Sequence, residues 1–400
     1  MTDLAQPTST EEQHVLDICE KVLHDHDPKS DRTAFLGAQY DAGLAWVHFD
    51  EGWGGLGLSP KLQATINRKM ASHGAPSPAF INVIGYGMCA PTVYTHGSDH
   101  QRERYLRPLF TCEEIWCQLF SEPGAGSDVA GLSSRAVRDG DEWVVNGQKV
   151  WTTLAHVSKW GCLITRTDPE APKHKGLTYF VVDMRQPGVE VRPLRQMTGD
   201  AEFNEVYFTE ARIPDSERLG DVGDGWRVAL TTLMNERVAI GGGAAPRGSG
   251  AIADAVAAWK AMPPDRQDPA TRDELMRLWS NAEVARLTNM RASQNRAMGT
   301  PGPEGSTGKL AFAENNKEIY AFVMQLLGAD GMLYGSYQVE RSAVAMGDAP
   351  LQQKFLRSRA NSIEGGTSEV MRNILGERVL GLPGDVRTDK DLPWAQVPRN

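Results

Sequence analysis

The spacing of apolar residues changes twice along this 400-residue chain. From about residue 11 to 115, segments such as Glu11–His24 and Leu62–Ser72 repeat apolar residues every three or four positions, which predicts amphipathic helices. Branched and aromatic runs between about 116 and 222 predict short strands, and helical spacing returns from about 223. This order does not fit a doubly wound sheet, in which strands and helices alternate. We therefore expect an α+β chain with domains over residues 1–115, 116–222 and 223–400.

The middle block contains several short β runs. Glu142–Gly147 is predicted to be a strand that ends at an Asn146-Gly147 hairpin turn. Further strands are predicted over Trp160–Thr167, Leu177–Val182 and Glu205–Phe208. Strands this short and this closely spaced are typical of a small barrel or sandwich.

The last block has four stretches of helical spacing. They are Trp226–Ile240, Arg272–Met298, Lys309–Leu327 and Pro350–Asn361. Pro263-Pro264 and the segment 300–303 should interrupt the helices because proline lacks the backbone N–H. The polar segment after Gly381 is expected to be extended.

Charge and composition exclude several classes of protein. The formal net charge is −9, whereas a nucleic-acid-binding protein usually carries a basic face. No apolar run is long enough to span a bilayer, and Met1–Gln13 does not resemble a signal peptide, so we expect a cytoplasmic protein without membrane contact. The five cysteines are scattered, unlike a disulfide framework or a zinc site.

Three stretches contain residues suited to a planar, phosphorylated ligand. Ser121–Asp128 is rich in glycine and serine, which allows close backbone approach to a ligand but is also typical of surface loops. Asn146–Thr153 places a tryptophan beside two threonines, which could wall a heteroaromatic ring or form an ordinary strand with the indole in the core. Ile363–Arg372 has two glycines before Thr-Ser, which predicts a helix N-cap that could bind phosphate or act as a cap alone.

In this order and spacing, the three stretches resemble the acyl-CoA dehydrogenase family, and most of all its bacterial fatty-acid- and sterol-degrading members. The resemblance extends from the Trp53–Gly57 loop to Glu377–Pro383. It implies an N-terminal helical domain, a middle β-barrel domain and a C-terminal four-helix bundle. It also implies bound FAD and a homodimer or homotetramer, because one chain rarely completes the FAD site in this family.

The resemblance assigns roles to individual residues. The 120–127 loop would lie against the flavin and the thioester end of CoA, and the 151–153 stretch would cover the isoalloxazine, with Thr153 near its N5. The 325–328 segment would reach the FAD of a neighbouring subunit. The implied FAD contacts are Phe120, Ser121, Gly126, Ser127, Trp151, Thr152, Thr153, Gln325, Gly328, Thr367 and Glu369. The implied substrate contacts are Ser127, Arg237 and Gly365.

The catalytic base must be chosen between two glutamates. Many family members have a glutamate directly before Gly-Thr-Ser, but that position is Gly365 here, and Glu364 comes one residue too early. A branch similar to isovaleryl-CoA dehydrogenase takes its glutamate from a helix, directly before an arginine, and Glu236-Arg237 matches it. The residues three and four positions from Glu236 include no cation, and burial there would raise its pKa, as suits a base. We therefore assign Glu236 as the catalytic base.

The family's reaction then follows for this chain. Glu236 would remove an α-proton while hydride leaves the β carbon for the flavin, and the Gly365 N–H and a ribityl hydroxyl would donate to the thioester oxygen. An electron-transferring flavoprotein would accept the electrons. The Arg-Phe-Gly segment common in the family is missing between Gly243 and Glu274, so a hetero-oligomer is an alternative assembly. Two alternative functions are a non-catalytic partner subunit and an acyl-CoA oxidase.

Overall fold

The computed structural model describes residues 9–240, 246–297, 304–334, 338, 349–386 and 389–398. Its first part consists of helices α1 (Ser9–Asp25), α2 (Arg32–Asp41), α3 (Gln63–Ser72), α4 (Pro78–Ile81), α5 (Ala90–His96) and α6 (Asp99–Phe110). Asp31 caps α2, and Ser98 forms a capping box with Gln101 at the start of α6. α1 and α3 confirm the two helices predicted from apolar spacing.

A mixed sheet of eight strands follows, in the order β6-β7-β3-β2-β4-β5-β8, with β1 paired to β4. The strands are β1 (Trp116–Leu119), β2 (Arg135–Asp139), β3 (Glu142–Thr153), β4 (Trp160–Arg166), β5 (Leu177–Asp183), β6 (Val189–Pro193), β7 (Phe203–Pro214) and β8 (Arg218–Leu219). β3 and β5 are not neighbours in this order, yet the rings of Trp143 and Phe180 lie 5.5 Å apart. The sheet therefore curls around one apolar core, as expected of a small barrel.

The predicted Asn146-Gly147 hairpin turn is wrong. β3 continues through both residues, with a bulge in its pairing with β7 at this point. Gly147 has a φ of +153°, and a Cβ added there would lie 2.2 Å from the Ser134 hydroxyl oxygen. This glycine therefore allows a close approach of two chain segments, and it does not turn the chain back. The loop between β2 and β3 contains Gly140, at a φ of +63°.

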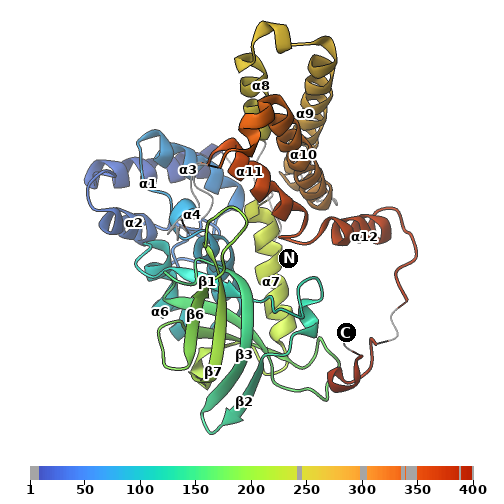
Figure 1. The fold of residues 1–400 in the computed structure, drawn as a ribbon. Helices are drawn as coiled ribbons and strands as arrows, with labels where there is room; N and C mark the ends of the chain where they lie inside the picture. The colour runs from blue at the N-terminus through green and yellow to red at the C-terminus, as the bar shows by residue number, and fades with distance from the viewer. Residues whose placement is uncertain are drawn as a thin grey trace.

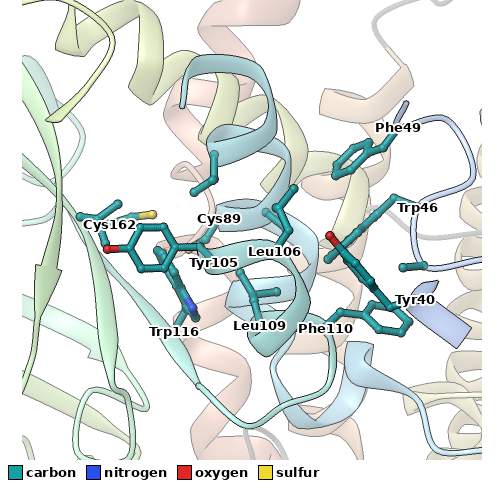
Figure 2. Packing of buried hydrophobic residues seen from close by; sticks show 14 of the residues in the cluster. Tyr40, Trp46, Phe49, Cys89, Tyr105, Leu106, Leu109, Phe110, Trp116 and Cys162 are labelled. Carbon is teal, nitrogen blue, oxygen red and sulfur yellow. The ribbon is translucent and has the colours of Figure 1, made fainter. Parts of the chain in front are cut away.

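The N-terminal helices and the sheet share one core (Figure 2). Trp116 of β1 is fully buried, and the ring of Tyr105 from α6 meets it edge-on at 5.2 Å. Cys89 and Cys162 lie in the same core, and all five cysteines are buried free thiols. Because β1 is fixed on both sides, the loop that follows it starts from a rigid position.

The last part is helical again. Its helices are α7 (Gly225–Ile240), α8 (Ala251–Ala261), α9 (Pro269–Ala297), α10 (Glu304–Leu327), α11 (Leu351–Ser358) and α12 (Ser368–Arg378). Apolar side chains of α8, α9, α10 and α11 form one core, which is the expected four-helix bundle. α7 instead packs against β5, α5 and the π-helical turn Gly85–Cys89, and it stands between the sheet and the bundle in Figure 1.

The four predicted helices of this part are confirmed as α7, α9, α10 and α11, although Met298 lies outside the described residues. α8, in which six of the eleven residues are alanines, is not predicted. In the described part of the chain, no helix combines the length and apolar character needed to cross a membrane.

Gly147→Ala should destabilise the fold, because the new methyl group would also lie 2.7 Å from the Ser134 Cα, which cannot move without the backbone. Overpacking of this kind costs about 1–3 kcal/mol. Urea unfolding measures the loss. Gly305→Ala on α10 is the matched control, because nothing lies within 4 Å of a Cβ there, and its stability should stay equal or rise slightly. Equal stabilities of the two variants would contradict this account of the bulge.

Candidate active site

A buried ion pair joins the first two sequence motifs. The Lys149 ammonium on β3 lies 2.8 Å from the Glu122 carboxylate and donates to the Phe120 carbonyl at 3.0 Å. The side chains of Lys149 and Glu122 are 0% and 4% exposed. Glu122 also accepts hydrogen bonds from the backbone N–H groups of Ser133 and Ser134. Every strong donor near this carboxylate therefore favours its charged form.

These contacts determine the pKa of Glu122. Burial alone would raise the pKa of this carboxyl, but the charge and hydrogen bond of Lys149, together with the Ser133 and Ser134 donors, lower it to about 2. The Glu122 carboxyl is therefore ionised at neutral pH, whereas burial lowers the pKa of Lys149 and Glu122 opposes that shift. The contact between the two side chains holds the 120–127 loop against β3.

The loop and the tryptophan form one exposed surface. The Val150 N–H donates to the Ser121 carbonyl at 2.9 Å, which places the two motifs side by side. Trp151 follows at a bulge in β3 with a φ of +60°, its side chain is 58% exposed, and its ring meets Phe203 edge-on at 5.9 Å. A non-glycine residue in the left-handed region is strained and is often found at functional sites.

The shape of this surface fits a flat ring system such as a flavin. Gly126 and Ser127 are exposed, and a Cβ added at Gly124 or Gly126 would meet nothing within 4 Å. An exposed indole face next to open backbone is suited to stacking and to hydrogen bonds from N–H groups.

The remaining members of these two motifs lie below the surface. Phe120 is buried, and its ring meets Tyr179 edge-on at 5.8 Å. Thr152 is also buried, and its hydroxyl has no hydrogen-bond partner among the described residues. Thr153 is half-buried at the end of β3. Strand alternation explains why neighbouring residues of the motif face opposite sides.

Glu236 lies close to the same loop. It is half-buried on α7, and its Oε2 is 3.5 Å from the side-chain nitrogen of Gln118, which is two residues before Phe120. The Thr232 hydroxyl, one turn earlier, is within 2.9 Å of the hydroxyls of Thr92 and Tyr179, which fixes the rotation of α7. The side chain of Arg237 lies outside the described residues.

Glu364 has a different environment. Both of its carboxylate oxygens accept from the Arg357 guanidinium, at 3.0 and 2.8 Å, and the Asn361 amide donates to one of them at 2.9 Å. The same guanidinium lies 5.8 Å from the Phe203 ring, which in turn contacts Trp151. Glu364 is therefore held as the ion-pair partner of Arg357.

The third motif forms a turn and a helix cap. Gly365 and Gly366 have φ values of +61° and +92°, which favour glycine, and the Thr367 side chain then accepts from the Val370 N–H at the start of α12. The Lys309 ammonium on α10 donates to the Gly366 carbonyl at 2.5 Å. Burial lowers the pKa of Lys309, although nearby carboxylates, Glu236 among them, oppose this shift.

The other predicted site residues lie at the end of α10 and on α12. Gln325 and Gly328 are exposed at the end of α10, and Glu369 pairs with Arg372 across one turn of α12. A cavity of about 420 Å³ lies between the 195–199 loop, the 331–334 segment and α11. None of the predicted site residues lines it.

Sequence reasoning missed the contacts made by the C-terminal segment. Trp394 lies 4.4 Å from the Arg166 guanidinium, and its ring N–H donates to the Gly131 carbonyl. The Lys173 ammonium lies 2.9 Å from the carboxylate of Asp128, which follows the 120–127 loop. It also lies 3.0 Å from the carboxylate of Asp389. A tryptophan in a polar tail was the one available signal, because such a residue is rarely left in solvent.

Comparison with known proteins identifies the family. Three family models match the chain in sequence: the N-terminal domain of acyl-CoA dehydrogenases over residues 12–113, the middle domain over 117–211 and the C-terminal domain over 223–380. The chain belongs to the acyl-CoA dehydrogenase family. Members of this family are FAD-dependent oxidoreductases of lipid metabolism, and the exposed loop and indole described above fit that cofactor.

Two similar proteins come from Mycobacterium tuberculosis. Acyl-CoA dehydrogenase FadE34 is 40% identical over 345 residues, which are 86% of this chain and 45% of that protein, so the chain spans less than half of FadE34. Acyl-CoA dehydrogenase IpdE1 is 36% identical over 364 residues, 91% of each protein.

Solved structures have the same fold. The Tcur3481-Tcur3483 steroid ACAD is 26% identical with a TM-score of 0.70, over 96% of this chain and all of the solved chain. The ChsE4-ChsE5 complex from Mycobacterium tuberculosis, at 24% identity and a TM-score of 0.67, covers 95% of this chain and 99% of the solved one.

The buried ion pair should make stability depend on pH. The folded-state pKa of Glu122 is about 2, below its ordinary value of 4.5, so its contribution is fully present above that ordinary value and is lost as the pH falls toward 2. The double variant Glu122→Gln/Lys149→Met should therefore lose less stability than the native protein across this acid range. Thermal unfolding at a series of pH values measures the difference.

Lys149→Met alone is the informative control. It leaves a buried carboxylate without its cation, which typically costs about 3–5 kcal/mol. It should be less stable than the double variant at neutral pH. Identical acid profiles for the native protein and the double variant would disprove the assignment.

Proposed function

We propose that this chain catalyses the α,β-dehydrogenation of an acyl-CoA thioester to the trans-2-enoyl-CoA, with FAD as cofactor and Glu236 as catalytic base. One observation carries the proposal. The Glu236 carboxylate lies 3.5 Å from Gln118, two residues before the loop suited to a flavin, whereas Glu364 is bound to Arg357 through both oxygens.

Each group of the site has a role in this reaction. The 120–127 loop and Trp151 hold the cofactor, which supplies the hydride acceptor when bound. Glu236 takes the α-proton on a carboxylate oxygen, and the Gln118 amide orients that carboxylate. The Gly365 N–H, in its left-handed turn, donates to the thioester oxygen as negative charge develops there.

The substrate class and the electron acceptor extend this proposal. A solved relative is described as a steroid ACAD, so bulky steroid-derived thioesters are the first substrates to test. We further propose that a cytoplasmic electron-transferring flavoprotein accepts the electrons. Hydrogen peroxide formed in proportion to turnover would instead identify an acyl-CoA oxidase.

A non-catalytic partner subunit is the second candidate, because ChsE4-ChsE5 is a complex of two chains. Glu236 beside the cofactor loop favours a catalytic chain. FAD that co-purifies with this chain alone and is bleached by an acyl-CoA would support the catalytic role.

Glu236→Gln should nearly abolish flavin reduction by substrate while FAD stays bound. The substitution keeps size and hydrogen bonding but removes the basic carboxylate, and loss of a general base costs about 10²–10⁴ in rate. Anaerobic stopped-flow absorbance measures the rate. Glu364→Gln is the matched control, and it should keep most of the rate while losing some stability, because Arg357 loses its partner. The reverse pattern would show that Glu364 is the base.

The active assembly should be a homodimer or homotetramer. Gln325 and Gly328 are exposed at the end of α10, where a neighbouring subunit's FAD could reach them. Light scattering coupled to gel filtration, with flavin absorbance recorded on the same peak, tests this. An active, FAD-loaded monomer would contradict the prediction, and FAD bound only after a second chain is added would indicate a hetero-oligomer.

A further inference from the structure

We propose that Arg357 is a positioning residue of the cofactor site, which holds the Trp151 indole in place through the ring of Phe203. The inference rests on the proposed function, because Arg357 has this role only if Trp151 flanks the FAD. Arg357 lies on α11 and belongs to none of the three sequence motifs.

Trp151 receives little support from its own strand. Its side chain is 58% exposed, and its φ of +60° is strained for a residue other than glycine. The pairing of β3 with β7 is irregular between Lys149 and Thr152, so the regular ladder does not fix the residue between them. The ring of Phe203 on β7 meets the indole edge-on at 5.9 Å. The position of this ring therefore limits where the indole can lie.

Arg357 reaches Phe203 from the helical bundle. Its guanidinium carbon lies 5.8 Å from the centre of the Phe203 ring, within the range of a cation–π interaction. Its Nε lies 3.9 Å from the carboxylate of Glu202, the residue before Phe203. Two other nitrogens donate to the two oxygens of Glu364 at 3.0 and 2.8 Å, which fixes the plane of the guanidinium. The Phe203 ring therefore contacts a fixed cation from the bundle and the Trp151 indole from the sheet.

A second side chain of α11 holds the same segment. Gln353, one turn before Arg357, donates from its side-chain nitrogen to the Asp200 carboxylate at 2.7 Å and to the Thr198 carbonyl at 3.4 Å. Both acceptors lie in the loop that leads into β7, which begins at Phe203. Residues four positions apart lie on the same face of a helix. One face of α11 therefore holds both the loop and the ring that contacts the indole.

This arrangement makes one wall of the cofactor site depend on the bundle. An aromatic pair is favourable only over a narrow range of ring positions, so a small shift of the indole changes its contact with a flavin. Loss of the guanidinium removes the cation–π contact that orients the Phe203 ring. FAD should then bind more weakly, and the indole should quench the emission of the bound flavin less.

Arg357→Met keeps the aliphatic stem and removes the guanidinium. We expect the Kd for FAD to rise about 10-fold, which is within the range of a desolvated cation–π contact. A dilution series of the holoenzyme, followed by flavin fluorescence, measures both the Kd and the emission of the bound cofactor. Arg359→Met is the matched control, because the Arg359 guanidinium lies 4.4 Å from the Phe355 ring within the bundle. Its Kd should stay within about twofold of the native value, even where its Tm falls.

Two double variants test the route of the effect. In Trp151→Ala/Arg357→Met, the second substitution should change the Kd by less than about twofold, because the indole through which Arg357 acts is absent. Glu364→Gln/Arg357→Met should bind FAD as weakly as Arg357→Met alone, because the contact that matters is to Phe203.

The outcomes separate this inference from the proposed function. Additive effects of Trp151→Ala and Arg357→Met would overturn the inference, as would native FAD binding in Arg357→Met or full recovery in the Glu364→Gln double variant. If Arg357→Met does not fold, Phe203→Leu removes the other partner of the same contact. It should show the same rise in Kd, and unchanged binding there would overturn the inference. If Trp151→Ala alone binds FAD as the native protein does, the proposed cofactor role of Trp151 is wrong, and the inference is wrong with it.

Discussion

The buried ion pair between Lys149 and Glu122 is the interaction on which the rest of the site depends. It lies beneath the cofactor loop, where water cannot replace either partner. Two charges in this position are costly to bury unless each finds a partner, so the folded state is stable only when the loop and β3 come together. The exposed Trp151 and the open backbone at Gly126 lie on the two segments that this ion pair holds together.

α7 connects the same core to the proposed base, Glu236. Its buried Thr232 lies between hydroxyls from α5 and β5, so the helix is fixed to the same core that fixes β1. Glu236 lies one turn further along, opposite Gln118 at the other end of β1. The base and the cofactor loop are therefore positioned by one rigid unit, whereas the Gly365-Gly366 turn belongs to the helical bundle. The proposed mechanism needs both units, because the base lies on one and the Gly365 N–H on the other.

Much of the fold could be predicted because the spacing of apolar residues along the chain indicates helices and strands. α7, α9 and α10 are long uninterrupted helical stretches, and β4 and β5 are rich in branched and aromatic residues. The errors arose where the same residue types are compatible with two different local structures. Asn146-Gly147 has the composition of a hairpin turn, but the need for space beside Ser134 decides the conformation there, and no local pattern reveals that neighbour. β6 was missed because none of its five residues is fully buried, although Val189 and Val191 pack against the core of the sheet.

Part of the candidate site could also be predicted from the sequence, and part depends on contacts between residues that are distant in sequence. Glu236 could be chosen over Glu364 from the resemblance to known relatives, since the two differ in register against a family motif. The physical reason for the choice lies in contacts distant in sequence: Gln118 is 118 residues away from Glu236, and Arg357 reaches Glu364 only because a 3₁₀ turn over Arg359–Ser362 folds the chain back. A carboxylate proposed as a base and one that is bound by a guanidinium look alike in a sequence. They differ in the side chains that lie beside them after folding, which are Gln118 for Glu236 and Arg357 with Asn361 for Glu364.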